Sequence, residues 1–184
     1  MKRLSFALLP LFIFGCASST RISAGPGQPA RTITFEEHDR VRAKVDADTG
    51  MRVYSVVPDV EESKEGKLSM ASVLMAAPEG TRAAGVSGEF GFQTTGDHVR
   101  YRECGNLQLV VDGKALPKKS TRYFGSLGNG KVVEAVVARV SPEDVARMVA
   151  AKMVEYRLCH TRGTLSIRER NLLGQMLARY QERD

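Results

Sequence analysis

Beyond residue 40, the pattern of apolar and polar positions is mainly that of short β-strands. Apolar residues in 41–45 alternate with charged ones, and a polar stretch then leads into a second apolar run at 51–57. This order predicts a β-hairpin. A helix over 35–45 is the alternative, because Thr34 and Glu37 have the spacing of a capping box.

The same kind of pattern continues through most of the chain. Strands are predicted at 68–76, 84–94, 99–104, 107–111, 121–127, 131–140 and 153–160. Asp112-Gly113 and Asn129-Gly130 lie between such runs, and dipeptides of this kind are strong hairpin signals. The run 131–140 is rich in valine, so we expect it to be a central strand.

Two helices are predicted near the C-terminus. Ser141 and Pro142 precede two acidic residues, as at a helix start with proline in the first turn. Ser166 and Glu169 form a capping box before apolar residues at helical spacing. The predicted fold is α+β: a mainly antiparallel sheet, sandwich-like or strongly curved, with two C-terminal amphipathic helices, in a single domain over 31–184.

The N-terminus has a different composition. Lys2 and Arg3 precede an apolar run over 4–14, which is too short to cross a hydrocarbon layer that needs roughly 20 helical residues. This arrangement predicts a signal peptide over 1–15.

The end of this leader, Ile13-Phe14-Gly15-Cys16, resembles the lipobox of bacterial lipoproteins. The resemblance implies that Cys16 is diacylated and becomes the mature N-terminus, which would anchor the protein to a membrane. Ala17 stands where lipoproteins retained in the inner membrane carry Asp, so the implied location is the outer membrane, on its periplasmic face. If Cys16 is not lipidated, we expect a secreted or periplasmic protein.

Residues 16–30 are small, polar and rich in Gly and Pro. They predict a flexible tether with a reach of about 20 Å.

Charge adds little to this interpretation. The chain has 27 Lys and Arg against 21 Asp and Glu, a net charge of +6, and the excess is spread along the sequence, as on a solvated surface. No nucleic-acid recognition motif is present. The predicted partners are the membrane, through acylated Cys16, and another envelope protein; the oligomeric state is left open.

The remaining cysteines allow two hypotheses. Cys104 and Cys159 could form a disulfide in an oxidising compartment, which would close a loop of about 56 residues and stabilise by roughly 4 kcal/mol. It requires the two Cα atoms to lie within about 7 Å. With His98 and His160 the same cysteines could instead bind zinc, but their spacing matches no common ligand pattern.

Two further motifs lack residues that their function requires. Residues 125–131 have the glycine spacing of a phosphate-binding loop, but Val132 replaces the required Ser or Thr and a strand is predicted to follow. Asp46 and Asp48 resemble the start of a calcium loop whose twelfth position, here Val57, lacks the glutamate. We expect no metal and no cofactor.

None of the usual hydrolase motifs occurs in the chain together with its partner residues. The function hypothesis is therefore a lipid-anchored, non-enzymatic envelope lipoprotein that faces the periplasm as a binding or structural accessory. The alternatives are a carrier of a small apolar ligand, in which the sheet forms a cup, and an envelope enzyme whose site is assembled from distant residues.

Overall fold

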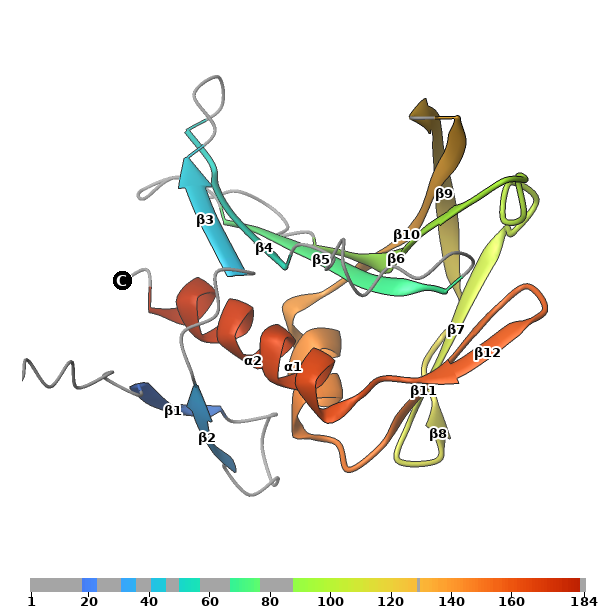
Figure 1. Ribbon diagram of the computed structural model, residues 1–184. Helices are drawn as coiled ribbons and strands as arrows, with labels where there is room; N and C mark the ends of the chain where they lie inside the picture. Colours follow the sequence, from blue (N-terminus) through green and yellow to red (C-terminus); the bar gives the residue numbers. More distant parts are fainter. Residues whose placement is uncertain are drawn as a thin grey trace, which may run out of the picture.

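A computed structural model describes residues 18–22, 31–35, 41–45, 50–56, 67–76, 88–128 and 130–182 of the chain (Figure 1). The strands are β1 (Ser18–Ile22), β2 (Arg31–Phe35), β3 (Val41–Val45), β4 (Arg52–Val56), β5 (Ser69–Ala76), β6 (Gly88–Gly96), β7 (Asn106–Val111), β8 (Lys114–Ala115), β9 (Lys119–Gly128), β10 (Lys131–Val140), β11 (Val154–Leu158) and β12 (Thr161–Thr164). The helices are α1 (Pro142–Ala150) and α2 (Ile167–Gln181).

Ten of the described strands form one antiparallel sheet in the order β12-β11-β7-β9-β10-β6-β5-β4-β3, with β8 paired to β7. The sheet curls into a half-barrel (Figure 1). The strands β1 and β2 pair with each other in a separate two-stranded sheet. β10 lies in the middle of the large sheet, as its valine-rich sequence predicted.

The two helices lie on the concave side of the curled sheet, where α2 runs beneath β3, β4 and β5 and packs on α1 (Figure 1). The sheet and the helices together enclose one hydrophobic core. Its largest fully buried side chains are Met70, Leu74, Phe90, Phe92, Leu107, Leu109, Met148, Leu158, Leu172, Leu173 and Met176. The concave side is therefore filled by side chains of the protein itself.

Close approach of neighbouring strands accounts for one of the glycines in β6. A Cβ atom at Gly91 would collide with the backbone of Val136 on β10. Only glycine fits where the two backbones lie this close.

Both helix starts agree with the sequence. Ser141 and Ser166 are the N-caps, and Asp144 and Glu169 complete a capping box in each case. α1 is short and does not divide clearly into an apolar and a polar face. The prediction of two C-terminal helices is thus confirmed for their number and position.

The predicted hairpin after residue 40 is also confirmed. β3 pairs with β4 from Val41↔Val56 to Val45↔Arg52, so the alternative helix over 35–45 is wrong for the described residues 41–45. β1 lies within the stretch 16–30, for which the sequence predicted a tether; the rest of that stretch and the leader lie outside the described residues.

Two other predictions differ from the structure. Residues 99–104 do not form a strand, because loop 97–105 turns away from the sheet and is bound by side chains of β9, β10 and β12. The strand β12 was not predicted, since Thr161–Thr164 carries a glycine and no apolar residue. Its pairing with β11 supplies the stability that its own sequence lacks.

Candidate functional site

A buried carboxylate holds loop 97–105 in place. Glu134 on β10 is 2% exposed and accepts the backbone N–H of Arg100 with both oxygens and that of Tyr101 with Oε1, all at 3.0 Å. A carboxylate at this depth is costly unless it is hydrogen-bonded, and these donors satisfy it. Glu134 is therefore occupied by the loop backbone, and its role is structural.

The predicted disulfide is present at the end of this loop. Cys104 and Cys159 are bonded, with a Cα–Cα distance of 5.3 Å. Cys104 is buried, whereas Cys159 is exposed in the β11–β12 turn, with φ of +50°. The bond joins two segments that are 55 residues apart in the sequence.

Hydrogen bonds reinforce the same corner. The hydroxyls of Tyr101 and Thr161 are 3.0 Å apart, within hydrogen-bond distance. Thr121 donates its hydroxyl to the carbonyl of Cys104 and its backbone N–H to that of Gly105 at 3.1 Å. Loop 97–105 is thus fixed to β9, β10 and β12.

A pocket of about 290 Å³ opens beside the disulfide. Its lining consists of the two cysteines, small or polar residues and two cations: Cys104, Gly105, Asn106, Gln108, Lys118, Arg157 and Cys159. The Gln108 side chain donates to the carbonyls of Leu109, at 3.2 Å, and Leu116, at 2.6 Å. The lining contains no acidic residue.

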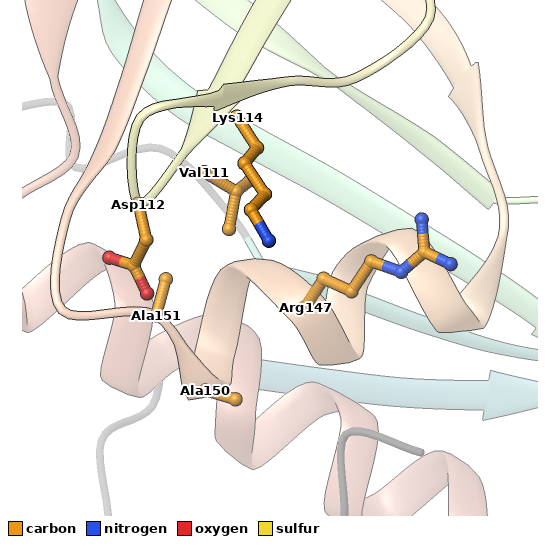
Figure 2. A pocket seen from close by; sticks show the side chains of 6 residues that line it. All are labelled: Val111, Asp112, Lys114, Arg147, Ala150 and Ala151. Atoms are coloured by element: carbon orange, nitrogen blue, oxygen red, sulfur yellow. The ribbon is translucent and has the colours of Figure 1, made fainter. Parts of the chain in front are cut away.

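A second pocket, of about 330 Å³, lies between the β7–β8 turn and the end of α1 (Figure 2). Val111, Asp112, Lys114, Arg147, Ala150 and Ala151 line it. The Asp112 carboxylate accepts the backbone N–H groups of Lys152 and Met153, both at 2.9 Å. Figure 2 shows the side chain of Lys114 extending over the pocket above α1.

Two described residues have displaced pKa values, and neither lines these pockets. Burial, with smaller effects of Glu169 and Tyr101, raises the pKa of Tyr156, whose ring packs 4.1 Å from that of Phe92. The hydrogen bond with the Ser141 side chain is the main cause of the lowered pKa of exposed Glu143. Both shifts arise from packing and helix capping.

The structure places the other sequence candidates as follows. Residues 125–128 and 130–131 belong to the end of the β9–β10 hairpin, with Gly130 at φ +74° and Val132 in a strand, so no helix follows the glycines. Asp46, Asp48 and Val57 lie outside the described residues. The sulfurs of Cys104 and Cys159 are bonded to each other, and no group of three potential metal ligands is found in the described ranges.

Sequence reasoning missed the cation pair next to the disulfide. Arg157 on β11 lies directly opposite Arg162 on β12. The signal was available: the two arginines are equidistant from a two-residue turn at 159–160, which is the spacing of a tight hairpin. The hairpin was not predicted because residues 161–164 contain no apolar residue.

No protein-family model matches the chain, and no curated protein or solved structure shows significant similarity to it. Within the described ranges, no helix has the length and apolar character needed to cross a membrane.

Proposed function

We propose that this protein is a lipid-anchored lipoprotein of the bacterial outer membrane, whose domain faces the periplasm and binds a partner without catalysing a reaction. The observation that carries the proposal is the leader, in which Lys2 and Arg3, an apolar run and Gly15-Cys16 follow in order. The Cys104–Cys159 disulfide supports it, because such bonds persist in oxidising compartments.

The choice of binding over catalysis rests on the two pockets. Their linings consist of cations, small residues, amides and one aspartate that is engaged by backbone N–H groups. Neither lining pairs a nucleophile with a general base, which acyl or phosphoryl transfer by the protein would need. Cations and amide donors are suited instead to holding an anionic group.

The filled concave side of the sheet favours this proposal over an apolar-ligand carrier. A carrier needs an enclosed apolar cavity of several hundred cubic ångströms. Here Leu173 and Met176 of α2 and Phe90 of β6 are fully buried within the core on that side. An apolar ligand would have to displace α2.

Membrane fractionation of cells that express Cys16→Ala tests the anchor. We expect wild type in the membrane pellet, with outer-membrane density in a gradient, and Cys16→Ala in the soluble fraction. Cys104→Ser is the matched control, because it removes a cysteine outside the leader and should stay in the pellet. Mass spectrometry of the mature N-terminal peptide should show a diacylated Cys16; unchanged pelleting of Cys16→Ala would contradict the proposal.

A further inference from the structure

Three cations gather on the outer face of the sheet around the disulfide. Lys118 and Arg157 line the 290 Å³ pocket, and Arg162 lies directly opposite Arg157 in the β11–β12 register. Both arginines and Lys118 are exposed. We call Lys118, Arg157 and Arg162 the cation cluster.

No acid in the described part of the chain forms an ion pair with the cation cluster. Like charges directly opposite each other on neighbouring strands destabilise a sheet. Neither Glu103, next to the bonded Cys104, nor Glu155, two residues before Arg157, forms an ion pair with it among the described residues. The fold therefore keeps together positive charges that repel one another.

A disulfide and hydrogen bonds join the pocket walls, which also provide a further donor. The disulfide joins Cys104 to Cys159, and the carbonyls of Cys104 and Gly105 are held by Thr121. The exposed Asn106 amide, which makes no hydrogen bond among the described residues, lines the same pocket. Walls fixed in advance reduce the entropy that a ligand loses on binding.

We propose that this pocket binds a doubly charged phosphate group, as in a phosphomonoester or a diphosphate. A guanidinium donates two parallel hydrogen bonds to phosphate oxygens, and an ammonium adds a point charge. The lining holds two cations and no acid, and Arg162 lies beside Arg157; this arrangement suits a dianion better than a single carboxylate. The inference rests on the proposed binding function, for which it names the ligand class.

The phosphate group has two possible sources, a free solute or a lipid headgroup. The binding experiment uses the full-length lipidated protein, extracted in a non-ionic detergent. Calorimetric titration with inorganic pyrophosphate and with glycerol 3-phosphate tests the free ligands. Mixed micelles that contain phosphatidic acid, compared with phosphatidylcholine, test the headgroup.

We expect saturable binding at one site that weakens about tenfold in Arg157→Gln, as when a charge-assisted hydrogen bond is lost. Arg162→Gln should weaken binding about threefold by removing charge from the edge of the site. Arg147→Gln, in the pocket beside α1, is the matched control and should bind like wild type.

Melting without ligand gives a second readout. If the two arginines serve binding, replacing either one should leave the melting temperature unchanged or raise it, because the repulsion between the cations is relieved. A lower melting temperature for both arginine variants would assign them a structural role and overturn the inference.

The binding outcomes separate the possibilities. Binding of soluble phosphates alone supports the pocket and assigns it to free phosphate groups, whereas binding of phosphatidic acid that pyrophosphate displaces supports it and assigns the headgroup. Absence of saturable binding, or its loss in Arg147→Gln but not in Arg157→Gln, would overturn the inference. The fractionation test of Cys16 is independent of these results.

Discussion

Lys118 and Lys119 are neighbours in the sequence but have opposite surroundings. Lys119, the first residue of β9, donates to Asp144 Oδ2 at 2.7 Å, and the two side chains are 24% and 10% exposed. Asp144 also completes the capping box of α1. Lys118 is exposed and lines the pocket beside the disulfide, where Arg157 is the other cation.

The comparison distinguishes charged side chains that stabilise the fold from charged side chains that the fold brings together despite their repulsion. At the start of α1, the Asp144 carboxylate attracts both the Lys119 ammonium and the partial positive charge of the helix N-terminus. In the cation cluster, charges of one sign are kept together by a disulfide and by a loop anchored on Glu134. The first arrangement raises the free energy of unfolding, whereas the repulsion in the second lowers it.

Of the changes considered, removal of the disulfide should lower the unfolding free energy most. The double variant Cys104→Ser/Cys159→Ser should lose about 3–4 kcal/mol of unfolding free energy, since the bond closes a loop across 55 residues. Urea unfolding measures the change. Reductant should lower wild type to the same midpoint and leave the variant unchanged; a wild type that is insensitive to reductant would contradict the prediction.

The second effect concerns the carboxylate below the loop. Two backbone N–H groups, those of Arg100 and Tyr101, donate to the Glu134 carboxylate, and Glu134→Gln removes the negative charge and replaces one accepting oxygen by an NH2 group that cannot accept. We expect a loss of about 2 kcal/mol in urea unfolding. Glu155→Gln is the matched control, because Glu155 is exposed, and its effect should stay within about 0.5 kcal/mol.

Much of the fold could be predicted from local signals. Alternation and Asn-Gly predicted the β9–β10 hairpin. Ser141 before Pro142 and two acids predicted the start of α1, and the capping box of Ser166 and Glu169 predicted that of α2. These signals are local because each uses residues within a few positions of one another. They required no knowledge of the tertiary structure.

The candidate site could not be predicted in this way. Its parts come from loop 97–105, β7, the segment before β9, β11 and the β11–β12 turn, and only the tertiary fold brings them together. The cysteines gave the one long-range signal, a disulfide hypothesis in competition with zinc. Glu134 gave no long-range signal, because a single acid among valines does not indicate which backbone N–H groups it will bind.

The two lysines provide the most direct test of the contrast. Lys119→Met should cost about 1 kcal/mol, because it leaves the partly buried Asp144 without its cation. Lys118→Met should leave the unfolding free energy unchanged within about 0.5 kcal/mol. A cycle that combines Lys119→Met with Asp144→Asn should show coupling of at least about 0.5 kcal/mol; equal losses for the two lysine variants would contradict the distinction between them.

The smallest expected effect has the opposite sign. Arg157→Gln or Arg162→Gln should each stabilise the free protein by about 0.2–1 kcal/mol, because either change ends the repulsion between two cations in register. The double variant should gain little more than either single one, and the gain should disappear near 1 M salt, where charges are screened. Arg122→Gln is the control: Arg122 pairs with Glu89, so its replacement should lower stability slightly. A loss in all three variants, measured by urea unfolding at low salt, would show that the arginines around the disulfide serve the fold as Arg122 does.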